Sequence, residues 1–405
     1  MDMIAENDQQ FIDDVMERVR SFLTQLERGE TVLVLQSLKD ALDQEIAWAV
    51  EDAARRTSLL SEIAGCGDYG RLAEIHSEFN THEMDAFLKM QSVVDLHRHC
   101  TDYRDLLAGR TVYLVVQEMV GNGHGDPPVP FALISMGSDG REEQTLITDQ
   151  DYLVVYGDDG GLAADDYFTA FSLLLVERLA EIGFKKCTGD IMPSNPTWRG
   201  SYAQWRRKLL AIVRYEYEDY AKNLMDLIVL SDARYVAGDR DLAARLIGLI
   251  RGLEQDYFQA LWGMAKAATE MKLALGFLKR FWTEGGGEHK GEFNLKLLAW
   301  APLVMNVRIL AINQGIPASC TLKRIELLQQ EGSFSPAMAK GLTNAYLVLT
   351  RYRILLQIKV IKGILKDSHY INPYELPADE REQVRQALLR IEDLQKVIHT
   401  NFSIM

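Results

Sequence analysis

The chain has 405 residues, 47% apolar and 25% charged, a composition typical of globular proteins with two or three domains. Its four cysteines, Cys66, Cys100, Cys187 and Cys320, form no CxxC pair, which argues against a disulfide framework or a zinc site and favours the cytoplasm. A net charge of −14 disfavours nucleic-acid binding, and we expect no signal peptide and no membrane-spanning run.

Most of the negative charge lies in the first hundred residues, which hold 20 acidic and 9 basic side chains. Apolar residues recur at helical spacing from Phe11 onward, and no proline precedes residue 127. One stripe consists of Leu35, Leu38, Leu42, Ile46 and Val50. We predict an acidic helical domain over residues 1–110, with breaks at Gly29 and at residues 65–67. Its outer face is either a solvated surface or a surface for docking or for forming a homodimer.

The third predicted helix runs from Leu72 to Met90 and on through His97. His97 and Cys100 share one helical face, whereas His99 points elsewhere, and no further metal ligand is close in the sequence. We therefore interpret these residues as structural. Another helix is predicted over residues 101–120, followed by a linker with three glycines and two prolines over residues 121–128.

Two predicted strands then flank a glycine-rich turn. Phe131 to Met136 is a short apolar run that ends at Gly137 and Ser138, and Tyr152 to Tyr156 is a second run rich in Val and Tyr. Such a turn is common in simple hairpins, but this connection is longer than a hairpin requires.

Asp149 and Asp151 stand at the start of the second strand. Side chains at positions i and i+2 of a strand point to the same face, so we expect both carboxylates to converge. Two carboxylates beside a turn with free backbone N–H groups suit Mg²⁺ (or Mn²⁺) and the phosphates that it carries. The alternative is a solvated loop end.

The chain continues with a predicted helix over residues 165–183 and a short third strand over residues 184–192. Residues 217–236 are predicted as a helix and a strand-like piece that closes this module at Gly238. Arg199 and the cluster Arg206, Arg207 and Lys208 either meet a triphosphate or form a solvated helix face. Residues 241–405 are predicted helical, with a kink at Pro302.

The string from residue 137 to residue 151 resembles the signature of the DNA polymerase β-like nucleotidyltransferases, a Gly-Ser turn followed by Asp-x-Asp. More narrowly, it resembles a bacterial family of nucleotidyltransferases related to the PII-protein uridylyltransferases. The matching positions are Gly137, Ser138, Gly140, Arg141, Glu143, Gln144, Thr148, Asp149, Gln150 and Asp151. A second matching stretch contains Cys187, Gly189, Met192, Asn195, Pro196 and Trp198. The resemblance covers residues 110–405, and the C-terminal part is similar to the family's helical substrate-binding domain.

The resemblance implies an α+β fold, in which a small mixed-sheet nucleotidyltransferase core (residues 111–240) lies between helical domains (residues 1–110 and 241–405). It implies that Asp149 and Asp151 bind Mg²⁺ and that a third carboxylate assists. Asp190 is the first candidate for that role, and Asp226 and Asp232 are weaker ones. Nucleotide-binding residues are then Gly137, Ser138, Arg141, Gln144 and Arg199, although Arg141 is as well explained as a brace for Glu143 or Asp151.

Three functions are compatible with these features. The first is transfer of a nucleoside monophosphate from an NTP to a hydroxyl of a regulatory protein, in signal transduction, or of a small molecule. The second is a nucleotide-sensing module with weak catalysis. The third is an interaction scaffold that acts through the acidic N-terminal helices. The Asp-x-Asp motif favours the first two.

Overall fold

The computed structural model describes residues 15–214 and 220–404, and the chain forms two compact units, residues 1–61 and 62–405. In the first unit, a helix over residues 15–23 is followed by a turn at residues 24–26 and by most of α2 (Arg28–Gly65). The break therefore precedes Gly29. On α2 the predicted apolar stripe is exposed, as at Leu42 and Ile46. Phe11 and residues 217–219 lie outside the described residues.

The second unit begins with a helical pair, α3 (Tyr69–Met90) and α4 (Val93–Gly121). The helix predicted to run through His97 ends at Met90, because Gln91 adopts a left-handed conformation with φ 51°. The hydroxyl of Ser92 then accepts a hydrogen bond from the N–H of Asp95 and caps α4. The domain boundary that we expected at residue 110 falls inside α4.

The central sheet has four strands in the order β5–β3–β1–β6. Its strands are β1 (Phe131–Ser135), β3 (Tyr152–Tyr156), β5 (Arg199–Ser201) and β6 (Arg234–Gly238). β1 is antiparallel to both β3 and β6, whereas β5 is parallel to β3, so the sheet is mixed. The two strands predicted on either side of the Gly-Ser turn are confirmed, and so is the α+β class with helical flanks.

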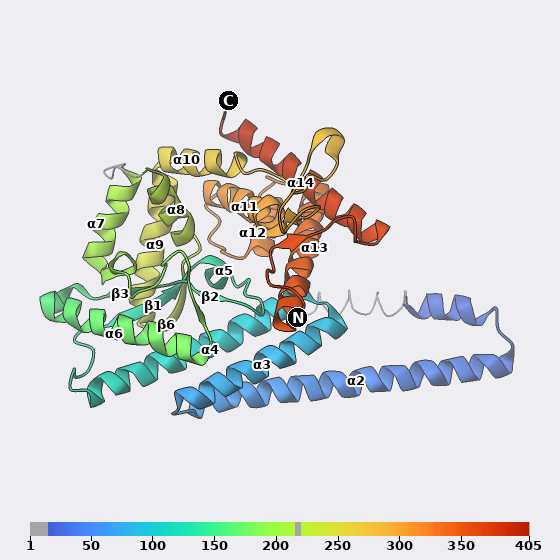
Figure 1. Ribbon diagram of the computed structural model, residues 1–405, viewed down its shortest axis with the longest axis horizontal. Coiled ribbons are helices and arrows are strands. Elements are labelled where there is room, and N and C mark those ends of the chain that lie inside the picture. Colours follow the sequence, from blue (N-terminus) through green and yellow to red (C-terminus); the bar gives the residue numbers. More distant parts are fainter. Residues whose placement is uncertain (1–14, 215–219, 405) are drawn as a thin grey trace. The chain divides into compact units, whose positions relative to one another are not determined.

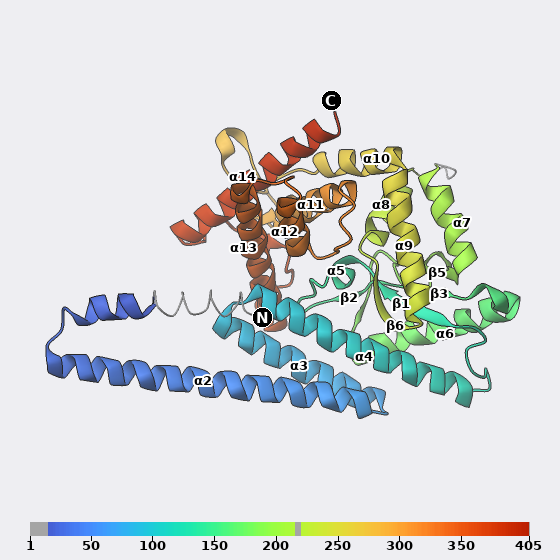
Figure 2. The same cartoon turned by 180° about the vertical axis from the view of Figure 1, so that it is seen from behind.

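Helices cover both faces of this sheet. On one face, α6 (Gly161–Ile182) places Phe168 and Phe171 with ring centroids 5.3 and 5.0 Å from that of Phe131. Because side chains alternate along a strand, Ala132 and Ile134 point the opposite way, into the core that includes α9 (Arg240–Asp256) and the C-terminal helices. α9 packs against β1, β3 and β6, as the view from behind shows (Figure 2).

A two-stranded parallel ladder lies beside the Asp-x-Asp segment. It consists of β2 (Asp149–Gln150) and β4 (Lys185–Lys186). The third strand predicted over residues 184–192 is therefore confined to two residues, and it pairs with β2 rather than with the central sheet. It ends because the chain turns: the N–H of Asp190 donates to the carbonyl of Cys187, and Asp190 has φ 55°.

The other helical elements of the described chain complete the second unit (Figure 1). In chain order they are α5 (Gly137–Gly140), η1 (Asp158–Gly160), η2 (Pro196–Trp198), α7 (Tyr202–Val213), α8 (Tyr220–Leu230), α10 (Phe258–Thr269), η3 (Phe277–Lys279), η4 (Lys296–Trp300), α11 (Ala301–Asn313), α12 (Thr321–Gln330), α13 (Pro336–Ile361) and α14 (Ala378–Asn401). The C-terminal part is thus helical as predicted, apart from the short antiparallel pair β7 (Phe293–Asn294) and β8 (Tyr370–Ile371).

Pro302 produces a local change of helix type. The element η4 is a π-helix in which the N–H of Ala301 donates to the carbonyl of Lys296, and it continues directly into α11. Since proline has no N–H and its ring crowds the preceding turn, the wider π-turn accommodates Pro302 without ending the helix. In the described residues one segment, Lys296–Asn313, has the length and composition of a membrane span, with a mean hydropathy of 1.2, but 67% of it is buried inside the protein.

A buried carboxylate joins the sheet to the C-terminal helices. Asp232 has no exposed surface and accepts hydrogen bonds from three arginines. Nη1 of Arg141 is 2.5 Å from Oδ2, Nε of Arg308 is 3.1 Å from Oδ1, and Nη1 of Arg324 is 3.3 Å from Oδ1. Burial alone would raise the pKa of Asp232, but the three guanidinium groups hold it below its usual value. Such a cluster offsets its desolvation cost only while every partner is present.

We expect Asp232→Asn to lower the free energy of unfolding by about 3–5 kcal/mol, because three buried guanidinium groups would lose their shared counter-charge. Urea unfolding followed by circular dichroism measures this loss. Asp159 is exposed and makes no hydrogen bond in the described structure, so Asp159→Asn is the matched control. Equal stability of the two variants would contradict the role of the cluster.

Glu254 on α9 is buried next to this cluster. It is 2% exposed, and its Oε1 has no hydrogen-bond partner among the described residues. Burial is the main cause that raises its pKa to about 8; Arg324 opposes the shift and Asp232 adds to it. The folded protein therefore retains a proton on Glu254 at neutral pH.

This retained proton gives a predicted pH dependence of stability. Between the ordinary value of 4.5 and the folded value of about 8, the unfolded carboxyl loses its proton first, so Glu254 lowers stability progressively as the pH rises. We expect Glu254→Gln to remove this decrease of stability with pH. At the upper end of the pH range, the variant should have a free energy of unfolding that is higher by about 1 kcal/mol or more. Urea unfolding at a series of pH values tests this, and identical slopes for the variant and the wild type would refute it.

Candidate functional site

The turn after β1 lies directly against Asp151. Gly137 has φ 60°, and a Cβ atom at this position would lie 2.5 Å from Oδ2 of Asp151. The N–H of Met136 donates to the backbone carbonyl of Asp151 at 2.8 Å. Because only glycine combines this conformation with this close approach, the Gly-Ser turn predicted from the sequence is built around the second aspartate.

Ser138 lies in the same turn and is half-buried. Its carbonyl accepts a hydrogen bond from the N–H of Glu143 at 2.8 Å, which closes the turn. Its hydroxyl makes no hydrogen bond with the described residues. The N–H groups at the start of a helix have no acceptor within it, so the turn presents donors that an anion can use.

The two aspartates differ in their surroundings. Asp149 is exposed at the start of β2, whereas Asp151, between β2 and β3, is half-buried. Burial raises the pKa of Asp151, and the charge of Asp149 raises it further. Oδ1 of Asp151 is buried and has no hydrogen-bond partner among the described residues. The negative charge of Asp149 therefore acts on Asp151, which has one carboxylate oxygen without a hydrogen-bond partner among the described residues.

Cys187, just after β4, is also part of this site. Its thiol hydrogen-bonds to the side chain of Asp151, and burial, together with that carboxylate, raises the pKa of Cys187 to about 11. The thiol is therefore a neutral donor at ordinary pH. The sequence marked this cysteine only as a matching position in the family resemblance.

Two side chains that we expected at the nucleotide are held inside the protein. Arg141 donates to Glu143 at 2.8 Å and to Asp232, so of its two expected roles the structure shows the brace. Gln144 is buried, and its side-chain amide has no partner among the described residues. Gln150 anchors the acidic loop, since its Nε2 donates to the carbonyls of Val176 and Phe184, at 3.2 Å each.

Residues from distant helices fix the loop that leads to Asp149. On α4, Nδ1 of His97 lies 2.7 Å from the carbonyl of Gln144, and Arg104 donates to the carbonyls of residues 145 and 146. On α13, Oε1 of Gln357 accepts from the N–H of Ile147 at 3.3 Å. His97 also contacts the hydroxyl of Tyr346, at 3.0 Å. The structural role predicted for His97 thus has a specific partner, while Arg104 and Gln357 carried no recognisable sequence signal.

Asp190 is not brought together with the acidic pair. It is exposed, and its Oδ2 accepts a hydrogen bond from Asn195 at 2.9 Å. Within residues 15–214 and 220–404, no group of three or more His, Cys, Asp and Glu side chains is arranged to hold a metal ion. The weaker candidate Asp232 is occupied by its three arginines.

Arg199 lies on the central sheet rather than beside the acidic pair. Its Nη1 donates to the carbonyls of Pro193 and Ser194, at 3.0 and 2.7 Å. It lines a separate pocket with Lys208, whose ammonium lies 4.7 Å from the ring centre of Trp198. Burial lowers the pKa of Lys208 to about 8. Contacts within the protein thus explain the positions of Arg199 and Lys208, and no bound nucleotide is needed to explain them.

Two cations from the C-terminal helices complete the surroundings of the site. Lys296, the first residue of η4, is half-buried, and its electrostatic neighbours include Asp149, Asp151 and Cys187. Arg353 on α13 is an electrostatic neighbour of Lys296 and lies 3.9 Å above the ring of Trp300. Sequence reasoning missed both as site residues, because they lie about 150 and 200 positions beyond the motif.

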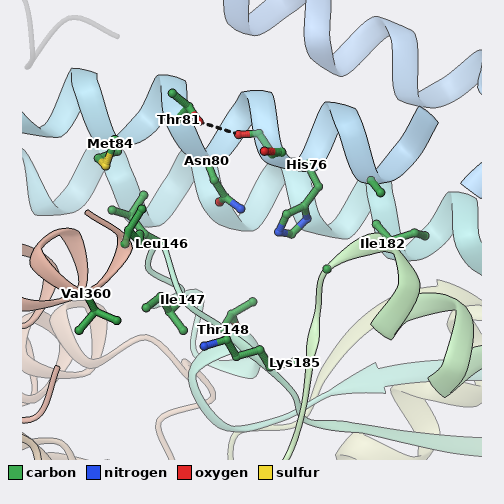
Figure 3. A pocket seen from close by; sticks show the side chains of 14 residues that line it. His76, Asn80, Thr81, Met84, Leu146, Ile147, Thr148, Ile182, Lys185 and Val360 are labelled. Carbon is green, nitrogen blue, oxygen red and sulfur yellow. Dashed lines mark hydrogen bonds between the residues drawn. The ribbon is translucent and has the colours of Figure 1, made fainter. Parts of the chain in front are cut away.

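A cavity of about 520 Å³ lies behind the acidic loop, and Figure 3 shows its lining. His76 and Asn80 of α3 form one wall, and Ile147 and Thr148 form the facing wall. His76 is buried, and burial lowers its pKa to about 3, so its ring is neutral. Residues 146–148 of the loop before Asp149 thus line a cavity on the side that faces α3.

Two family models match the chain. Residues 79–219 match the family described as "Putative nucleotidyltransferase DUF294", and residues 258–402 match the "Putative nucleotidyltransferase substrate binding domain". No curated protein matches the chain. The first match contains the Gly-Ser turn and both aspartates, and the second contains Lys296 and Arg353. The chain therefore belongs to the family of putative nucleotidyltransferases that these two models describe.

Proposed function

We propose that this chain is a Mg²⁺-dependent nucleotidyltransferase, which moves a nucleoside monophosphate from an NTP to a hydroxyl of a protein or small-molecule acceptor. The observation that carries the proposal is the packing of Gly137 against Asp151, whose buried and unpartnered Oδ1 lies beside a second carboxylate. A carboxylate in this condition requires a cation or a proton. The glycine that fits against it leaves the turn open to phosphate groups.

The two aspartates fit a magnesium ion. Mg²⁺ prefers oxygen ligands and is commonly held by one or two carboxylates, with water and phosphate oxygens supplying the other ligands. Asp149 and Asp151 would hold it, and it would relieve both the repulsion between them and the unsatisfied Oδ1 of Asp151. When bound, such an ion neutralises phosphate charge and orients the reacting groups.

The chain's own residues position the substrates. Gly137 allows the backbone to approach the phosphates, and Ser138 offers its free hydroxyl. Braced by Arg141, the turn keeps its shape as charge develops on the phosphoryl oxygens. The acceptor oxygen forms a bond to the α-phosphorus and the bond to the pyrophosphate oxygen breaks, so that pyrophosphate leaves. The proton of the acceptor hydroxyl passes to water. Catalysis here is mostly positioning and charge stabilisation.

The acceptor class follows from charge and architecture. A chain with a net charge of −14 does not favour a nucleic-acid acceptor. The model that matches residues 258–402, a mostly helical region, is described as a putative substrate-binding domain. We therefore favour uridylyltransferase-like modification of a regulatory protein in the cytoplasm, with a small molecule as the alternative acceptor.

A nucleotide-sensing module is the second candidate function. It is favoured by the position of Asp190, which hydrogen-bonds to Asn195 rather than joining the acidic pair. With two carboxylates, a site can bind Mg-NTP and yet lack a group to accept the proton of the acceptor hydroxyl. The two functions share the binding site and differ in turnover.

Loss of the two aspartates should affect nucleotide binding before any effect on stability. Asp149→Asn/Asp151→Asn should abolish Mg²⁺-dependent NTP binding in calorimetry and leave the melting temperature unchanged or higher, because the two carboxylates repel each other without metal. Asp159→Asn/Asp166→Asn changes two exposed aspartates and gives the same change in net charge. Unchanged NTP affinity in the first double variant would rule out the site.

Transfer of the nucleoside monophosphate can be followed with a labelled NTP. Incubation with each α-labelled NTP, Mg²⁺ and a cell lysate should yield a labelled protein or small molecule with the wild type only, and no label with Asp149→Asn/Asp151→Asn. Mg²⁺-dependent binding without transfer would establish the sensing module in place of the transferase. Absence of both NTP binding and transfer would contradict the proposed function and would favour the interaction scaffold.

Two glycines with similar positive φ angles allow a test of the close approach at Gly137. Gly137→Ala places a Cβ against Asp151, whereas Gly161 has φ 55° and no atom within 4 Å of its Cβ position. Both substitutions pay a backbone cost of about 1 kcal/mol. Only Gly137→Ala should also displace Asp151 and weaken Mg-NTP binding by about tenfold or more. Equal NTP affinity of the two variants would contradict the arrangement.

A further inference from the structure

Lys296 and Arg353 are two half-buried cations without counter-ions. Neither side chain makes a hydrogen bond or an ion pair with the described residues. The Arg353 guanidinium lies instead over the face of Trp300. Placing a cation away from water without an anion is costly, so such groups are commonly retained to bind an anionic ligand.

The geometry of η4 and α13 places these cations together. Trp300 ends the π-helix that Lys296 begins, and its Nε1 donates to the hydroxyl of Thr350, at 3.1 Å, one turn before Arg353 on α13. The indole is thus fixed by a hydrogen bond, and Arg353 rests on it at 3.9 Å. A guanidinium on an aromatic ring keeps its planar edge available for phosphate oxygens.

The surrounding charges leave these two cations unbalanced. Lys296 is influenced by Arg353, Asp149, Asp151 and Cys187, and Arg353 is influenced by Tyr346, Arg141 and Glu143. Arg141 and Glu143 already pair with each other. Burial raises the pKa of Tyr346, so its hydroxyl is neutral at ordinary pH. Once a divalent cation neutralises the two aspartates, the positive charges of Lys296 and Arg353 remain unmatched.

We propose that Lys296 and Arg353 bind the β- and γ-phosphates of the NTP, so that the C-terminal helical domain completes the nucleotide site. This inference rests on the proposed function, because the acidic pair must hold the metal-bound nucleotide next to these cations. The domain described as substrate-binding would then also contact the nucleotide. The leaving pyrophosphate then departs from a site formed by two domains.

The test compares NTP with NMP in calorimetric titrations of the full chain in the presence of Mg²⁺. Lys296→Gln and Arg353→Gln should each weaken NTP binding by about tenfold and change NMP binding by less than about twofold, since the lost contacts are to phosphates that NMP lacks. Lys340→Gln removes an exposed lysine from the same helix as Arg353 and should behave as the wild type. Arg353→Lys, which keeps the charge over Trp300, should recover part of the NTP affinity, and thermal unfolding of each variant checks its fold.

The outcomes separate this inference from the function on which it rests. If Asp149→Asn/Asp151→Asn loses NTP binding while Lys296→Gln and Arg353→Gln bind NTP as tightly as the wild type, the two cations have another role and the inference fails alone. If the cation variants weaken NTP and NMP equally, the contact is not to the β- and γ-phosphates, which also overturns it. If the aspartate variant keeps its NTP affinity, the proposed function fails as well.

Discussion

The pairing of Asp232 with three arginines is the interaction on which the arrangement of the site depends. Arg141 follows the Gly-Ser turn, while Arg308 and Arg324 belong to α11 and α12 of the C-terminal domain. One buried carboxylate thereby joins the turn to helices that are about 170 and 180 residues further along the chain. Because a buried charge tolerates little displacement from its partners, the turn and the C-terminal helices are held in a fixed relation.

The candidate site uses this fixed relation. In the proposed site, the sheet domain would supply the oxygen ligands of Asp149 and Asp151 and the close backbone approach at Gly137, and the C-terminal helices would supply the cations Lys296 and Arg353. The negative and positive groups of this site thus come from different domains. A metal-bound triphosphate offers a cation to the two aspartates and phosphate oxygens to the two basic side chains, so a bound nucleotide would account for both sets of groups.

Sequence reasoning recovered what depends on local pattern. The strands around the turn and helix α6 follow from the alternation and the helical periodicity of their apolar residues. The short β4, the break at Gln91 and the π-turn before Pro302 depend on local backbone conformation that side-chain patterns do not mark.

Long-range partners were beyond the reach of the sequence. Arg141 as a brace was foreseen with Glu143, but its second partner, Asp232, was considered only as a third carboxylate. Lys296 and Arg353 are ordinary residues of helical segments, and their lack of counter-ions becomes visible only once the chain is folded. Asp190 was favoured because it lies on the third predicted strand, whereas the turn at Cys187 places its carboxylate against Asn195.

The decisive experiment is a crystal structure of the chain with Mn²⁺ and a non-hydrolysable NTP analogue. We expect an anomalous peak for Mn²⁺ bound by Asp149 and Asp151, with the triphosphate over Gly137 and its outer phosphates at Lys296 and Arg353. A nucleotide bound elsewhere, or a metal peak away from both aspartates, would rule out the proposed site.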